Sequence, residues 1–142
     1  MGTGHEPVLT ITYELEGETV TKDSTFTAEL EPEWAPITLL NGSNRTTGDN
    51  PMAYRRIGNH VFLRGTINMT YSGTQKDICN LPFPTSGNHD VFAKCAGANI
   101  ASLIVRYGSN KLILGSIVAV SNGANQTDFS GWLDCTVDYW TD

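Results

Sequence analysis

The chain holds few side chains whose spacing could support catalysis or metal binding. Its three histidines are His5, His60 and His89, and none lies at ligand spacing from another histidine, a cysteine or a carboxylate. His89 is followed directly by Asp90, but neighbours on a strand point to opposite faces, so one metal ion could not easily take both. We therefore expect no metal site and no cofactor.

The cysteines and the catalytic motifs lead to the same expectation. Cys79, Cys95 and Cys135 form no Cys-x-x-Cys pair and lie in strand-like segments, which favours small buried thiols. The sequence has no Gly-x-Ser-x-Gly elbow, no phosphate-cradling glycine loop and no calcium loop. We predict that the protein is not an enzyme, although two of its carboxylates could still meet in space as they do in glycosidases.

The side chains best suited to binding are aromatic and polar residues near predicted turns. A ring can pack against the apolar face of a sugar while Asn, Asp or Arg side chains meet the hydroxyl groups. For each single ring, contact with the core or with another subunit is favoured over ligand contact. The rings in question are Trp34, Tyr71, Phe83, Trp132, Tyr139 and Trp140. As ligand-binding candidates we select residues on turns between core strands, namely Tyr71, Asn88, His89 and Asp90.

Alternating side chains predict the strands that must position these residues. One set shares a face at Val61, Leu63, Gly65, Ile67 and Met69, and a second set does so at Leu133, Cys135, Val137 and Tyr139. Residues 103–107 and 111–114 flank a short Gly-Ser-Asn loop and predict a hairpin whose second arm continues to Val120. Strands at this spacing without helical intervals indicate an all-β, antiparallel two-sheet β-sandwich of jelly-roll-like type. One alternative is a helix over residues 90–104, where the spacing is alanine-rich, although Gly97 and β-branched neighbours disfavour it.

The chain of 142 residues is long enough for one domain with a substantial core. Residues 8–15 alternate, and a Thr-rich second arm ends near Ala28, which predicts an N-terminal hairpin. The Glu31-Pro32-Glu33 segment interrupts the pattern because proline lacks a ladder donor. We therefore expect a hairpin and linker over residues 1–33 and a β-sandwich domain over residues 34–142.

Composition excludes two classes of partner. The net charge of −6 would repel a phosphate backbone, so we expect no nucleic acid, although Arg55, Arg56 and Arg64 could contact a local anionic group. The longest apolar stretch, residues 112–120, is well below the roughly 20 residues of a spanning helix. We expect no insertion into a membrane.

Four short motifs follow one another in the first half of the predicted sandwich. They are Leu40-Asn41-Gly42, Tyr54-Arg55-Arg56, the Gly-x-x-Val-x-Leu-x-Gly pattern of residues 58–65, and Leu81-Pro82. Their order resembles that in the C-terminal β-sandwich heads of bacteriophage tail fibres and receptor-binding appendages. The resemblance runs from Trp34 to the C-terminus, includes residues 104–108 and 131–139, and is interrupted over residues 83–99.

The resemblance implies a host-recognition head of a phage or prophage tail appendage. Such heads are homotrimers that join an upstream tail or baseplate protein and bind saccharides on the bacterial cell surface; threefold symmetry lets weak sites act together. Location in the virion tail, after assembly in the bacterial cytoplasm, follows from the same resemblance. The alternatives are a structural virion or baseplate assembly domain without ligand binding, a bacterial lectin-like carbohydrate-binding module, and, last, a glycan-degrading enzyme.

Overall fold

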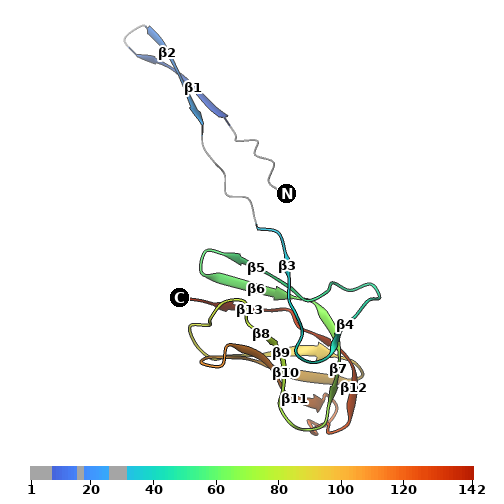
Figure 1. Cartoon of the computed structure of the whole chain (residues 1–142). Helices are drawn as coiled ribbons and strands as arrows, with labels where there is room; N and C mark the ends of the chain where they lie inside the picture. Colours follow the sequence, from blue (N-terminus) through green and yellow to red (C-terminus); the bar gives the residue numbers. More distant parts are fainter. Residues whose placement is uncertain (1–7, 16–17, 26–31) are drawn as a thin grey trace. The chain divides into compact units, whose positions relative to one another are not determined.

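The computed structural model describes residues 8–15, 18–25 and 32–142, and none of these lies in a helix (Figure 1). No described segment is therefore a helix that could cross a membrane. The chain divides into two compact units, Met1–Glu33 and Trp34–Asp142. In the first, β1 (Val8–Leu15) and β2 (Glu18–Thr25) form an antiparallel hairpin. His5 and residues 26–31, where we expect the second arm to end and the linker to begin, lie outside the described residues.

The second unit consists of two antiparallel sheets. The four-stranded sheet has the order β13-β6-β5-β3, and the seven-stranded sheet has the order β4-β7-β12-β9-β10-β11-β8. The strands are β3 (Ala35–Pro36), β4 (Ser43–Asn44), β5 (Ala53–Ile57), β6 (His60–Arg64), β7 (Thr66–Tyr71), β8 (Lys76–Asn80), β9 (His89–Cys95), β10 (Asn99–Arg106), β11 (Lys111–Ala119), β12 (Phe129–Asp134) and β13 (Val137–Trp140). The prediction of an all-β, two-sheet antiparallel architecture is confirmed, and residues 90–104 form strands instead of a helix.

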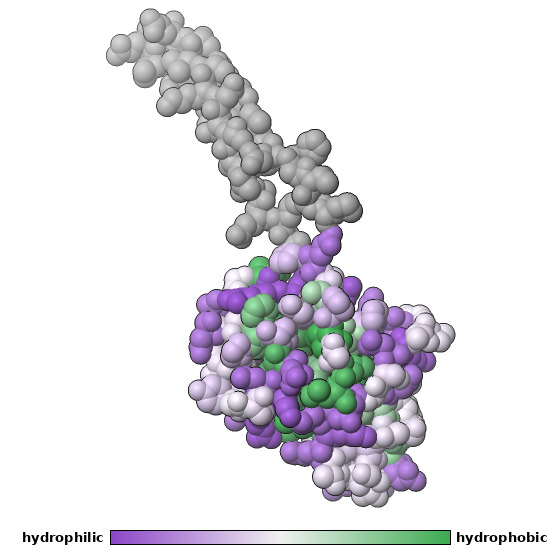
Figure 2. Space-filling model, in the orientation of Figure 1, coloured by the Kyte–Doolittle hydropathy of each residue, from purple (hydrophilic) through white to green (hydrophobic). Residues whose placement is uncertain are grey.

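The core contains the residues that the alternation of apolar and polar side chains predicts to be buried. Val61, Leu63, Ile67 and Met69 are at most 2% exposed, and the residues of the second alternating set are at most 4% exposed. The predicted hairpin is present as β10 and β11, paired from Asn99↔Ala119 to Arg106↔Lys111. On the outside, hydrophilic residues cover much of the unit, while hydrophobic ones gather near the middle of the visible face (Figure 2).

One bent ribbon belongs to both sheets. β6 continues into β7 and β12 into β13; β6 pairs with β13 in the four-stranded sheet, and β7 pairs with β12 in the seven-stranded sheet. The ribbon bends at Gly65 and Cys135, where the Cys135 amide donates to the Gly65 carbonyl at 2.8 Å. Gly65 has a φ of 140°, and a Cβ atom there would lie 2.7 Å from the Met52 backbone. Only glycine fits this corner without moving the backbone.

The three cysteines are buried free thiols, as predicted. Burial raises the pKa of Cys79 from its usual value of 9.0 to about 12. The pKa values of Cys95 and Cys135 are raised as well, chiefly by burial. Thiols held neutral in this way are poor nucleophiles and serve as small apolar side chains in the core.

Substitution of Gly65 by alanine is expected to destabilise the second unit strongly. The added Cβ meets backbone atoms that cannot rotate away, and the positive φ adds strain, so we expect a loss of about 2–4 kcal/mol in the free energy of unfolding. The control is Gly58→Ala, which has a φ of 60° but no atom within 4 Å of the added Cβ. It should cost only about 1 kcal/mol. Equal losses in urea unfolding would contradict the proposed role of the corner.

Stability is expected to fall at alkaline pH. The folded pKa of Cys79 lies above its usual value, so the unfolded chain releases this proton first as the pH rises, and folding becomes less favourable. The full stability is present below about pH 9, and each such group removes about 1.4 kcal/mol per pH unit up to its raised pKa. Urea unfolding as a function of pH measures this slope. Cys79→Ala should make the slope shallower; an unchanged slope would contradict the assignment.

Candidate functional site

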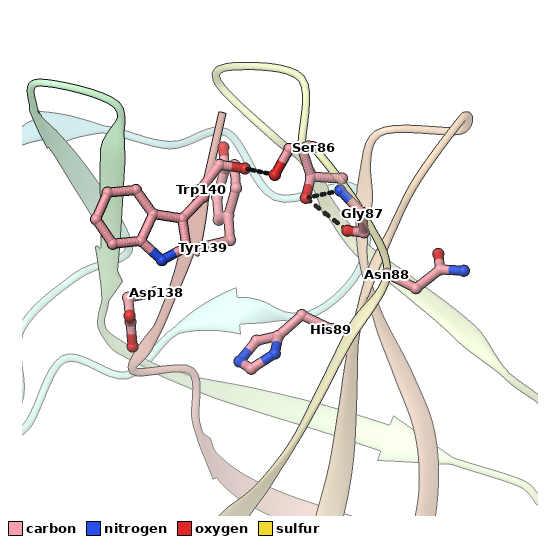
Figure 3. Close-up of a pocket in the computed structure, with 8 residues that line it drawn as sticks. Ser86, Gly87, Asn88, His89, Asp138, Tyr139 and Trp140 are labelled. Carbon is pink, nitrogen blue, oxygen red and sulfur yellow. Dashed lines mark hydrogen bonds between the residues drawn. The ribbon is translucent and has the colours of Figure 1, made fainter. Parts of the chain in front are cut away.

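A pocket of about 190 Å³ opens between the end of β13 and the loop that precedes β9 (Figure 3). We call it the Trp140 pocket. One wall is the end of β13, with Asp138, Tyr139 and Trp140. The other wall is the loop before β9 together with the first residue of that strand, and it contains Thr85, Ser86, Gly87, Asn88 and His89. Its lining thus combines an indole ring, a carboxylate, an imidazole and a hydroxyl group.

Hydrogen bonds fix the loop against β13. The Ser86 hydroxyl donates to the Trp140 carbonyl at 3.1 Å (Figure 3). The Ser86 amide donates to the same carbonyl at 2.9 Å. The buried Tyr139 hydroxyl donates to the Phe83 carbonyl at 2.8 Å and accepts from the Phe83 amide at 3.3 Å. Burial raises the pKa of Tyr139 to about 12, so this hydroxyl keeps its proton near neutral pH. The pocket wall is therefore attached to the core through side-chain and backbone bonds.

The Trp140 ring is exposed yet held in place. Its side chain is 58% exposed, and the His60 ring stacks against it with centroids 4.2 Å apart and planes at 12°. His60 Nε2 lies 2.6 Å from Asp138 Oδ2, which ties the carboxylate to the same support. The pairing of β13 with β6 explains this arrangement, because it sets Trp140 opposite His60. An aromatic face and a carboxylate are thus held side by side at the surface.

The structure brings two of the four predicted ligand-binding residues to this pocket. His89 and Asn88 line it, and the His89 ring and the Asp138 carboxylate face the same opening (Figure 3). The Asn88 side chain, however, points away, where its oxygen accepts a hydrogen bond from the Tyr107 amide at 2.8 Å.

The other two predicted residues do not line the pocket. Asp90 lies on the opposite face of β9 from His89 because side chains alternate along a strand. Tyr71 is only 7% exposed, and its hydroxyl donates to the Gly115 carbonyl at 3.2 Å. It belongs to the hydrophobic core, so little of its ring is available to a ligand.

The four ligand-binding residues predicted from the sequence do not include Asp138, Trp140 or Ser86, although Trp140 is among the aromatic rings near predicted turns. A signal for two of them was present, because alternation places Asp138 and Trp140 on the face of β13 opposite the buried Val137 and Tyr139. No pattern in the sequence around Asp138 and Trp140 indicates that they contact His60, which lies 78 residues away from Asp138.

A second cluster lies on the same face of the four-stranded sheet as Trp140. The guanidinium carbons of Arg55 and Arg64 lie 4.7 and 4.1 Å from the centroid of the Trp34 ring, and we call these three residues the Trp34 cluster. Phe62 links the cluster to the pocket, since it lies 5.8 Å from Arg55 and its ring is 4.2 Å from that of His60.

Arg56, the third member of the basic set in the sequence, does not join the Trp34 cluster. It lies over the Phe83 ring at 4.8 Å and donates to the Gly58 carbonyl and to the Asn59 side chain. These contacts secure the β5–β6 turn. The basic set of the sequence is therefore divided between two faces of the sheet.

The described residues contain no group of three His, Cys, Asp or Glu side chains placed to hold a metal ion. The chain matches no protein-family model, and no match is found among curated proteins or among solved structures. The resemblance to tail-fibre heads therefore depends on the sequence motifs alone.

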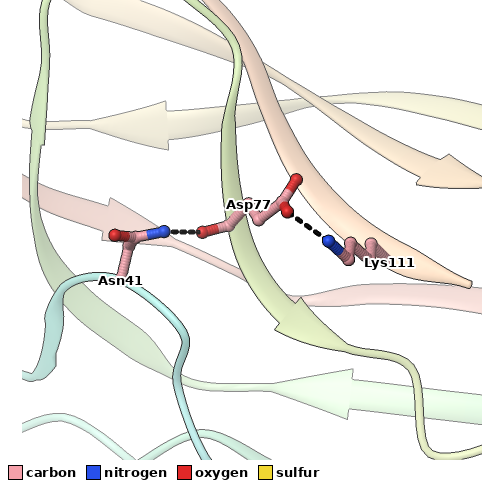
Figure 4. A network of polar contacts seen from close by, with 3 residues as sticks. All are labelled: Asn41, Asp77 and Lys111. Atoms are coloured by element: carbon pink, nitrogen blue, oxygen red, sulfur yellow. Dashed lines mark hydrogen bonds and ion pairs between the residues drawn. The ribbon is translucent and has the colours of Figure 1, made fainter. Parts of the chain in front are cut away.

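The motifs occupy positions that serve the fold. The Asn41 side chain donates to the Asp77 carbonyl at 2.8 Å, and the Asp77 carboxylate pairs with Lys111 (Figure 4). Gly42 has a φ of 78°, and a Cβ there would lie 2.6 Å from the Asn68 carbonyl oxygen. The Leu40-Asn41-Gly42 motif thus joins a turn to β7, β8 and β11, and takes no part in the Trp140 pocket.

Proposed function

We propose that residues 34–142 form a non-enzymatic host-recognition head of a phage or prophage tail appendage, which binds bacterial cell-surface saccharides in the Trp140 pocket. The observation that supports this most is the exposed Trp140 ring, held by the stacked His60 beside the Asp138 carboxylate. A fixed ring retains less rotamer freedom, so less entropy is lost when a ligand stacks on it.

The polar groups of the pocket suit the hydroxyl groups of a sugar. Asp138 is 56% exposed and can accept hydrogen bonds from sugar hydroxyls while the indole covers the C–H face of the ring. His89 and Ser86 add groups that donate or accept at the opposite wall. Such a small, open site binds weakly alone, which fits a function that depends on several sites acting together.

The proposal includes a jelly-roll-like sandwich that assembles as a homotrimer and follows an upstream tail or baseplate protein. Exposed apolar side chains on β9 and β10 support an assembly surface: Phe92 is 84% exposed, and Ile100, on the same face, is 37% exposed. The same surface favours the second candidate, a virion or baseplate assembly domain that binds no ligand. A lectin-like module outside a virion would use the same pocket.

Replacement of Trp140 by alanine is expected to abolish most saccharide binding. Loss of the stacking surface should weaken affinity by about tenfold or more, measured by glycan array and by titration with the best array hit. Tyr107→Ala is the matched control, since Tyr107 is 61% exposed but does not line the pocket. Saturable binding to bacteria with this pattern supports recognition. Stable trimers of the wild-type chain that bind neither glycans nor cells would support the assembly alternative.

Replacement of Phe92 by aspartate is expected to separate the trimer into monomers. A charge buried at an apolar contact is costly, whereas the monomer fold should tolerate it because Phe92 already meets solvent. Sedimentation equilibrium measures the mass, and Thr74→Asp, a charge added in an exposed turn, is the control. A wild-type chain that is monomeric at all concentrations would contradict the trimer, and an F92D trimer would place the interface elsewhere.

A further inference from the structure

We infer that the saccharide carries an acetamido group, and that the free main-chain edge of β13 in the Trp140 pocket recognises this group. The inference rests on the proposed function, since it names the class of sugar that the same pocket takes. It concerns the backbone of β13 together with the side chains of Trp140 and His89.

The first support is the direction of the backbone groups of β13. This strand lies at the edge of the four-stranded sheet, so one of its sides faces no other strand of that sheet. The Thr141 amide donates to the Asn59 carbonyl beside β6, whereas the Trp140 carbonyl accepts from the Ser86 amide on the other side. Successive residues of an antiparallel strand turn their backbone groups to alternate sides. The N–H and C=O groups of Asp138, two residues before Trp140, therefore face away from β6.

The second support is that these groups lie at the pocket and have no partner in the protein. Three consecutive residues of β13 line the pocket, and the opposite wall is the loop that bonds to the outer side of β13. Within residues 32–142, the Asp138 amide and carbonyl make no hydrogen bond. A ligand that covers them removes water from both groups, so it binds well only if it offers hydrogen-bonding groups of its own.

An acetamido group suits the space between the two walls. The N–H and C=O of a trans amide point in opposite directions. The carbonyl can accept from the Asp138 amide while the N–H donates towards His89, whose ring faces the same opening (Figure 3). A neutral imidazole accepts a hydrogen bond on one of its ring nitrogens. A hydroxyl group in the same position is a single atom with one proton and cannot reach both walls.

Trp140 supplies the apolar part of the site. The His60 ring stacks on the indole, with centroids 4.2 Å apart, and Trp140 remains 58% exposed. Trp140 and Asp138 are two residues apart on one strand, which corresponds to roughly 7 Å. A sugar ring that packs against the indole thus carries one of its substituents to the Asp138 backbone. The methyl of an acetamido group adds apolar contact there, which a hydroxyl substituent does not.

The open edge is too short for a peptide strand. The Ser86 amide already occupies the Trp140 carbonyl, so strand pairing cannot continue past this residue. The pocket of about 190 Å³ is also smaller than the roughly 300–1,000 Å³ of most small-molecule sites. Its size therefore favours one sugar residue with its substituent over an extended peptide.

The test titrates the full chain with three trisaccharides of one linkage that differ only in one substituent of each ring, which is acetamido, amino or hydroxyl. The N-acetylated trisaccharide should bind about tenfold more tightly than the other two, because it alone supplies the amide. In NMR spectra of the full chain, the Asp138 amide proton should move downfield with this ligand, as a new hydrogen bond requires, and not with the hydroxyl form. Acetyl-trialanine, which has amides but no sugar ring, should bind no more tightly than the hydroxyl form.

Two variants of Asp138 separate the backbone from the side chain. Asp138→Pro removes the amide proton, and edge strands tolerate proline where the N–H faces away from the ladder. It should abolish the preference for the N-acetylated ligand. Asp138→Ala removes the carboxylate but keeps the amide, so it should weaken all three trisaccharides and retain the preference. Thermal unfolding checks each fold; if Asp138→Pro unfolds, the amide shift of the wild-type chain decides the question.

The outcomes distinguish this inference from the proposed function. Equal affinity for the three trisaccharides, a preference that survives in folded Asp138→Pro, or acetyl-trialanine binding as tight as that of the N-acetylated sugar overturns the acetamido assignment. If none of the three trisaccharides binds, a wider glycan array decides. Acetamido sugars among its hits support the inference, and hits without them overturn it. An array without any hit overturns the proposed function itself.

Discussion

The close approach of Gly65 to the Met52 backbone is the constraint on which the second unit depends. It lets β6 and β7 bend from one sheet to the other without a gap, while Cys135 makes the matching bend beside it. Strands that change sheet at a bend form the corners of sheet-on-sheet packing. Both strands of the ribbon bend at the same place, so each sheet contains two paired strands of the ribbon. The core lies between the two sheets.

The same ribbon creates the Trp140 pocket. After the bend, β13 becomes an edge strand of the four-stranded sheet, with Val137 and Tyr139 in the core and Asp138 and Trp140 on the outside. The edge is not left open, since the Ser86 amide bonds to the Trp140 carbonyl. One face of β13 therefore packs in the core while the other lines the Trp140 pocket, and the hydroxyl of Tyr139 ties the strand to Phe83.

The parts of this structure that follow from local pattern were predictable, and the parts that depend on distant pairing were not. Period-two alternation located β6, β7, β12 and β13 because burial of one face repeats along each strand. Continued by one step from Met69, it also predicts the buried Tyr71, which we instead assigned to a turn. The support of Trp140 by His60 required the register between β6 and β13, which no local signal contains. Two of the four motifs, Leu40-Asn41-Gly42 and residues 58–65, bear on the fold, because Gly42 and Gly65 closely approach the backbone of neighbouring segments.

The three buried thiols give the second unit a further chemical property. In alkylation the thiolate is the nucleophile that attacks the reagent, and here the sulfur atoms are enclosed by the sheets and held in the protonated form. Cys135 lies at the corner itself, and Cys79 lies in β8, at the far edge of the larger sheet from β4. Alkylation of either sulfur thus requires the two sheets to separate. The rate at which Cys79 and Cys135 are alkylated therefore reports the rate of opening of the fold, without any introduced probe.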